Sequence, residues 1–176
     1  MRQLKAIILI ITLLFVFIAV EAEGFKKTGL KIESLEPVKI NGIEQWLLIR
    51  GNNETNPILL YLHGGPGHSL IPFAHAATDI LVDKFIVVYW DQRGTGLSYN
   101  EKIPLKTMNI NQFIDDTKTV TEYLKKKFGK EKIYLLGHSW GSMLGTLTVD
   151  KYPEDYVAYI GVGQVVSNKL MTEERD

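Results

Sequence analysis

The sequence predicts an α/β protein in which helices cover both faces of a mostly parallel sheet. Continuous apolar runs, each typical of a strand buried on both faces, recur at residues 58–62, 85–90 and 132–136. Helical patterns separate these runs, and strands that alternate with helices indicate a parallel sheet. A hairpin signal precedes the alternation, so the sheet is expected to begin with an antiparallel pair.

That hairpin is expected over residues 31–50, as two strands joined at Asn41-Gly42. Asn-Gly between alternating apolar residues favours a two-residue turn, because both residues tolerate the positive φ that the turn requires. A polar loop over residues 51–56 then leads to the first buried strand, which ends at Gly64-Gly65.

The clearest helix is predicted over residues 109–128, with Asp115 and Asp116 in its first turn and lysines in its last. Gly129 follows as the expected C-cap. One face of this helix is apolar and is formed by Phe113, Val120, Leu124 and Phe128.

Further helices are expected over residues 70–83 and 143–151, and a fourth strand of the alternating part over 156–162. The pattern ends on this strand and a short polar tail. We therefore expect the C-terminal strands of such a sheet to be missing, and the edge of the strand at 156–162 to be exposed.

The N-terminus has the layout of a secretory signal. Residues 6–20 are apolar except for Thr12, a positive lead-in precedes them, and small residues occur at positions 20 and 22. The alternative is an uncleaved anchor that attaches the protein to the membrane through residues 6–20. Either interpretation divides the chain into residues 1–22 and a partial domain at 23–176, and predicts export, to the extracellular space or the outer face of the membrane.

Composition excludes several classes of protein. The chain has 176 residues, with 20 basic and 20 acidic side chains, and this neutral balance argues against a nucleic-acid partner. It has no cysteine, which excludes disulfide scaffolds, zinc ribbons, iron–sulfur sites and thiol catalysis.

A G-x-S-x-G pattern at Gly137–Gly141 lies between a buried strand and a helix. A sharp strand-to-helix turn exposes the central serine above the sheet, and this predicts Ser139 as a nucleophile. The N–H of Trp140, at the helix N-terminus, is expected to stabilise an oxyanion. His138 adjoins the serine in sequence but is expected to point elsewhere, as a packed histidine and not as the base.

A second loop, His63–Gly67, follows the first buried strand. The backbone N–H groups of Gly64 and Gly65 are candidates for the second oxyanion donor. Gly94-Thr95-Gly96 does not complete a dinucleotide fingerprint, because Tyr99 occupies the third glycine position and no helix is expected to begin there.

Together, these two motifs and the segment Asp91–Ser98 resemble the α/β-hydrolase fold, and more narrowly its proline iminopeptidase branch, over roughly residues 36–166. The resemblance implies serine hydrolysis at an N-terminal residue, typically proline, of a small peptide or amino-acid derivative, with no metal and no cofactor. It implies that Ser139 is the nucleophile, and that Trp140 and Gly64 or Gly65 form the oxyanion hole. It also implies that Arg93 braces the loop beside the site.

The triad acid and base of this family are not found in the chain. In α/β-hydrolases they follow the nucleophile, but no histidine occurs in residues 140–176. The carboxylates Asp150, Glu154 and Asp155 fall on or just after the helix that follows the nucleophile, which is the wrong element for a triad acid.

Two hypotheses remain open at this stage. The chain is either the N-terminal part of an exported serine aminopeptidase, inactive alone, or a truncated non-catalytic α/β protein. Within the enzyme class, an esterase or thioesterase remains open too, because a serine nucleophile does not select the acyl group.

Overall fold

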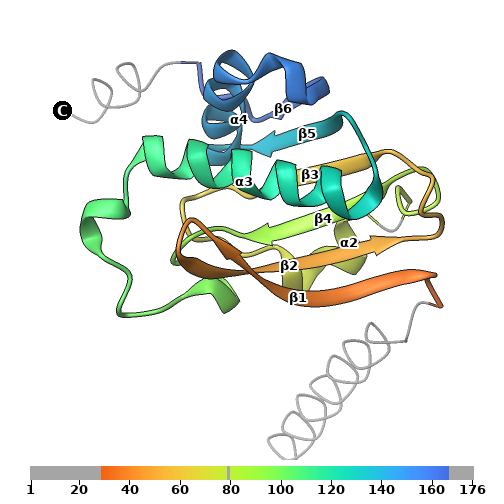
Figure 1. Ribbon diagram of the computed structural model, residues 1–176, viewed down its shortest axis with the longest axis horizontal. Helices are drawn as coiled ribbons and strands as arrows, with labels where there is room; N and C mark the ends of the chain where they lie inside the picture. The colour runs from red at the N-terminus through yellow and green to blue at the C-terminus, as the bar shows by residue number, and fades with distance from the viewer. Residues whose placement is uncertain (1–28, 79, 167–176) are drawn as a thin grey trace, which may run out of the picture. The chain divides into compact units, whose positions relative to one another are not determined.

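A six-stranded sheet organises the part of the chain that the computed structural model describes, residues 29–78 and 80–166 (Figure 1). The strand order is β1-β2-β4-β3-β5-β6. The strands are β1 (Ile32–Ile40), β2 (Ile43–Gly51), β3 (Ile58–Leu62), β4 (Ile86–Asp91), β5 (Ile133–His138) and β6 (Tyr156–Val162).

The sheet is mostly parallel, as predicted. Strands β4, β3, β5 and β6 pair in parallel, whereas β1 pairs with β2 and β2 with β4 in the antiparallel sense. Asn41 and Gly42 join β1 to β2 with φ values of 44° and 85°, which is the backbone that a tight two-residue hairpin turn requires. The predicted hairpin is therefore confirmed.

Helices cover both faces of this sheet. α3 (Ile110–Phe128) and α4 (Trp140–Lys151) pack against each other on one face, and α2 (Ala74–Thr78) lies on the other (Figure 1). The helix predicted over residues 70–83 is wrong in extent. Residues 71–73 form a 3₁₀ turn, and among the described residues of this range only α2 is α-helical. The range ends in a turn instead of a helix, because the carbonyl of Leu81 accepts the N–H groups of Lys84 and Phe85.

The boundaries of α3 follow from its caps. The side chain of Asn109 accepts the N–H of Gln112 at 3.1 Å, and Gly129 ends the helix at φ 62°. At 3.6 residues per turn from Ile110, Asp115 and Asp116 lie in the second turn of the helix, and their predicted place in the first turn is wrong.

The core lies between the sheet and these helices. β4 is buried over its whole length and β3 over nearly all of it, as expected for strands covered on both faces. The apolar face of α3 contributes Phe113, Val120 and Leu124 to this core, with Phe128 packed against it.

β6 forms one edge of the described sheet, where it pairs with β5 alone. Three of its apolar side chains, Val157, Ile160 and Val162, are 53%, 44% and 45% exposed. An exposed edge at residues 156–162 is what the sequence predicted.

The sheet lies within residues 31–176. The predicted signal or anchor at residues 1–22 lies outside the described residues. Within the described ranges, no helix is both long enough and apolar enough to cross a bilayer.

Candidate active site

Ser139 lies on a sharp turn between β5 and α4. Its backbone has φ 52° and ψ −116°, a conformation that a residue with a side chain rarely adopts. Its N–H donates to the carbonyl of Val162 in β6 at 2.9 Å, which ties the turn to the neighbouring strand. The half-buried hydroxyl makes no hydrogen bond to any described residue.

The two glycines of the motif are required by contact. A methyl group on Gly137 would lie 2.2 Å from the carbonyl oxygen of Gly141, and one on Gly141 would lie 2.1 Å from that of Leu62. Neither backbone oxygen can move aside, because each belongs to an element packed in the core. Glycine is therefore required at both positions, two residues on either side of Ser139, because backbone atoms leave no room there for a side chain.

Backbone strain at Ser139 gives a stability prediction. We expect Ser139→Gly to raise the free energy of unfolding by about 1 kcal/mol, because glycine adopts this φ without the steric cost of a Cβ. Ser139→Ala keeps the Cβ and is expected to leave stability nearly unchanged, although both variants lose the hydroxyl. Urea unfolding of the two variants measures the difference, and equal midpoints would contradict a strained turn.

The glycine-proline loop approaches the nucleophile directly. A methyl group on Gly64 would lie 3.1 Å from Cβ of Ser139 and 2.8 Å from Nδ1 of His138. The N–H groups of Gly64 and Gly65 make no hydrogen bond to any described residue. Trp140 is the first residue of α4, so its N–H has no partner within the helix. The structure thus brings Gly64 and Trp140 beside Ser139, and Gly65 follows Gly64 in the same loop.

His63, the first residue of this loop, contacts Gln92 directly after β4, and neither was predicted to be a site residue. The Nε2 atom of His63 lies 3.2 Å from the backbone N of Gln92, and its Nδ1 lies 3.1 Å from the carbonyl oxygen of Gly64. The Gln92 side chain donates to the carbonyl of His63 and accepts from the indole N–H of Trp140, both at 3.3 Å. The only sequence signal for either residue is its place directly after a buried strand.

Burial lowers the pKa of His63 below its ordinary value of 6.5. The unfolded chain therefore binds a proton at this residue at a higher pH than the folded chain does. The contribution of neutral His63 to the free energy of unfolding is fully present above about pH 6.5. It declines as the pH falls toward the pKa of His63 in the folded chain. We expect His63→Asn to flatten this acid limb, measured as urea midpoints between about pH 7.5 and 5. An unchanged slope would contradict the assignment of the limb to His63.

Arg93 braces the loop after β4, as the resemblance implied. Its guanidinium donates to both carboxylate oxygens of Asp116 in α3, at 2.8 and 2.9 Å, and both side chains are buried. Asp91, at the end of β4, accepts the N–H of Leu97 at 2.8 Å. These contacts fix the path of the segment that carries Gln92.

None of the four histidines is hydrogen-bonded to Ser139 in the described part of the chain. Besides His63, His75 is 2.8 Å from the guanidinium of Arg50, and His68 is exposed. His138 is exposed as well, so its prediction as a packed histidine is wrong. Side chains alternate along β5, and His138 shares the less buried face with Tyr134 and Leu136.

The predicted exclusion of the three carboxylates agrees with their positions. Asp150 lies near the end of α4, and Glu154 and Asp155 lie in the short 3₁₀ turn before β6. Asp155 is buried in ion pairs with Lys118 and Lys125 of α3. Among the described residues, no group of three or more acidic, histidine or cysteine side chains is arranged to hold a metal ion.

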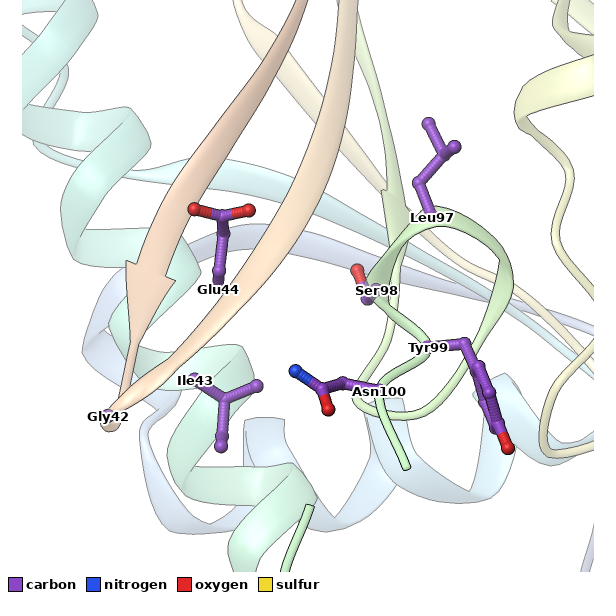
Figure 2. A pocket seen from close by; sticks show the side chains of 7 residues that line it. All are labelled: Gly42, Ile43, Glu44, Leu97, Ser98, Tyr99 and Asn100. Carbon is purple, nitrogen blue, oxygen red and sulfur yellow. The ribbon is translucent and has the colours of Figure 1, made fainter. Parts of the chain in front are cut away.

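A separate hollow of about 170 Å³ lies between the β1–β2 turn and the loop at residues 97–100 (Figure 2). Glu44 lines it from the hairpin and Asn100 from the loop, while the ring of Tyr99 turns away from the hairpin. In the sheet order, β4 and β3 separate β2 from β5, which at the usual strand spacing is roughly 14 Å. The hollow is therefore distinct from the Ser139 turn.

Comparison with known proteins places this geometry in a family. The family described as serine aminopeptidase, S33, matches residues 53–173. The chain is 43% identical over 136 residues to a probable aminopeptidase, YbaC, of Bacillus subtilis, covering 77% of this chain and 43% of that protein. It is 32% identical over 134 residues to a proline iminopeptidase of Clostridioides difficile, covering 73% of this chain and 42% of that protein.

Solved structures agree with these sequence relatives. A proline iminopeptidase of Mycobacterium smegmatis superposes with a TM-score of 0.65 at 27% identity, covering 80% of this chain and 47% of that one. Epoxide hydrolase A of Mycobacterium thermoresistibile has a TM-score of 0.63 at 21% identity, covering 82% of this chain and 44% of that one, and shows the fold alone.

The chain spans less than half the length of the curated relatives it matches. Over the part that it does span, the family match and the fold of the solved relatives agree. The chain belongs to the serine aminopeptidase S33 family of hydrolases, of the proline iminopeptidase type, and has the α/β-hydrolase fold.

Proposed function

We propose that this chain is the nucleophile-bearing N-terminal part of an exported serine aminopeptidase, which releases N-terminal residues, proline foremost, from small peptides. One observation carries the proposal. Ser139 is held at φ 52° on the turn between β5 and α4, its hydroxyl has no hydrogen-bond partner among the described residues, and Gly64 lies against it.

In the proposed reaction, Oγ of Ser139 attacks the carbonyl carbon of the first peptide bond. The carbonyl oxygen becomes negative, and the N–H groups of Trp140 and of Gly64 or Gly65 stabilise it. The C–N bond then breaks, the shortened peptide leaves as an amine, and water hydrolyses the acyl-serine. Catalysis by these residues needs neither a metal nor a cofactor.

A serine hydroxyl needs a base to accept its proton. His63 and His75 already have hydrogen-bond partners, and no histidine follows Ser139 within residues 140–176. We therefore place the triad acid and base in sequence beyond these 176 residues. In keeping with this, the chain spans only 42–44% of the length of the first relatives.

The substrate class follows from those relatives, which are named as aminopeptidases or proline iminopeptidases. The test compares a prolyl arylamide with a short acyl ester as substrates of the full-length protein. We expect hydrolysis of the arylamide, loss of at least about 10³-fold in kcat with Ser139→Ala, and full activity with Ser34→Ala on β1. We expect residues 23–176 alone to hydrolyse neither substrate.

If the full-length protein prefers the ester, the assignment as an aminopeptidase is wrong and the protein is an esterase. Activity that survives Ser139→Ala would contradict the serine mechanism. A full-length protein inert toward both substrates would favour a non-catalytic α/β protein.

Export rests on the charge and apolar pattern of residues 1–22. We expect the protein to be found outside the cytoplasm of the cells that produce it, and its chain there to begin near residue 23. N-terminal sequencing measures this directly. A protein with residues 1–22 intact in the membrane fraction would favour the anchor, and the same intact form in the cytoplasm would contradict export.

A further inference from the structure

The side chain of Gln92 bridges the two segments that carry the candidate oxyanion donors. It is 1% exposed, and its amide is used at both ends. Nε2 donates to the carbonyl of His63 in the glycine-proline loop, and Oε1 accepts from Nε1 of Trp140 on the nucleophile turn, each at 3.3 Å. The ring of Trp140 is fixed in turn by an edge-to-face contact with Phe113, with centroids 5.8 Å apart.

The backbone of Gln92 fixes the protonation of His63. The Gln92 N–H can only donate, so Nε2 of His63 is the acceptor and carries no proton. A neutral imidazole then holds its proton on Nδ1, which donates to the carbonyl of Gly64 at 3.1 Å. The lowered pKa of buried His63 agrees with a neutral ring.

These bonds orient two consecutive peptide groups. All described peptide bonds are trans, and in a trans peptide the C=O of one residue and the N–H of the next point in opposite directions. The carbonyl of His63 points to the Gln92 amide, so the N–H of Gly64 points away from it. The carbonyl of Gly64 points to the His63 ring, so the N–H of Gly65 points away from that ring.

We propose that Gln92 is a positioning residue, which orients the Gly64 and Gly65 N–H groups and holds them at a fixed separation from the N–H of Trp140. This inference rests on the proposed function, because an oxyanion hole matters only if Ser139 attacks a carbonyl. Its donors must meet the developing oxyanion at about 2.7–3.1 Å, and an error of about 1 Å costs roughly 10²-fold in rate. One rigid amide that contacts both segments sets that distance.

The first test is Gln92→Met in the full-length protein, with a prolyl arylamide as substrate. Methionine matches the length of glutamine but removes both hydrogen bonds. We expect kcat to fall roughly 10²-fold with KM within about threefold of wild type, because the oxyanion forms only in the transition state.

Thr121→Val is the control. Thr121 is fully buried in α3, and its hydroxyl lies 3.0 Å from that of Tyr156, which is 5% exposed. Tyr156 pairs with Ile133 at the start of β5, the end of that strand opposite the Ser139 turn. We expect Thr121→Val to lower the urea midpoint, because it removes a buried hydrogen bond, while leaving kcat unchanged.

Gln92→Glu tests the positioning role through the pH dependence of kcat, which a purely structural role of Gln92 would leave unchanged. A charged glutamate cannot donate to the carbonyl of His63, whereas a protonated one has a donor and an acceptor, as the amide does. We expect the ratio of kcat in Gln92→Glu to kcat in wild type to rise as the pH falls. Taking the ratio removes the titration of the triad base, which both proteins share.

The outcomes separate the two proposals. If Ser139→Ala abolishes activity but Gln92→Met keeps kcat within about threefold of wild type, the positioning role is wrong and the serine mechanism survives. Equal losses of kcat in Gln92→Met and Thr121→Val, or a Gln92→Glu ratio independent of pH, would also overturn it. If Ser139→Ala leaves activity intact, the proposed function fails first.

Discussion

Asp116→Ala is expected to lower the free energy of unfolding by about 3–5 kcal/mol. Asp116 is fully buried in α3, and the guanidinium of Arg93, itself buried, donates two hydrogen bonds to it at 2.8 and 2.9 Å. Gln45 and Asn41 donate to the same carboxylate at 3.0 and 2.8 Å. Without the carboxylate, a buried guanidinium is left unpaired, and its desolvation is no longer offset.

The neighbouring residue supplies the control for this prediction. Asp115 is on the same helix, but its side chain is 51% exposed and pairs with Lys151 at the surface. We expect Asp115→Ala to change stability by less than about 0.5 kcal/mol. Urea unfolding followed by circular dichroism measures both variants, and similar midpoints would contradict the role of Asp116 as the buried hub of the loop after β4.

Gly141→Ala is expected to destabilise the fold by about 3 kcal/mol, at the upper end of overpacking effects. The added methyl would lie 2.1 Å from the carbonyl oxygen of Leu62 and 2.7 Å from that of His63. Alanine favours the helix by about 1 kcal/mol over glycine, but this gain does not offset a clash with backbone. Because α4 must move away from β3, Ser139 should also lose its position and the full-length protein its activity.

Gly129→Ala separates this clash from the general cost of replacing a glycine. Gly129 caps α3 at φ 62°, and a methyl there would meet nothing within 4 Å. We expect a loss of about 1 kcal/mol from the left-handed backbone alone. Thermal or urea unfolding of the two variants gives the comparison, and a Gly141→Ala protein as stable as Gly129→Ala would show that the strand and helix separate easily.

Features that depend on a few adjacent residues were predictable from the sequence. Asn41-Gly42 specifies its turn because two successive residues must adopt positive φ. The Ser139 turn is similarly local, since its glycines are required by contacts within the turn and with the strand beside it. Gly129 was recognisable as a C-cap for the same reason.

Features that depend on contacts between distant segments were not predictable in this way. Gln92 contacts residues 29 and 48 positions away in the chain, and nothing in its neighbourhood marks it as a bridge. Asp115 and Asp116 look equivalent in the sequence, yet one is exposed and the other fully buried, because the rotation of α3 decides which faces the core. His138 was misplaced for the same reason, since its exposure depends on the face of β5 that it occupies.

Covalent labelling tests directly whether Ser139 is an activated nucleophile. The full-length protein is treated with a fluorophosphonate, which reacts with activated serine hydroxyls, and the modified peptide is identified by mass spectrometry. We expect a single label on the peptide that contains Ser139, absent in Ser139→Ala and retained in Ser34→Ala. A label on another serine, or none on a protein that hydrolyses a prolyl arylamide, would contradict it.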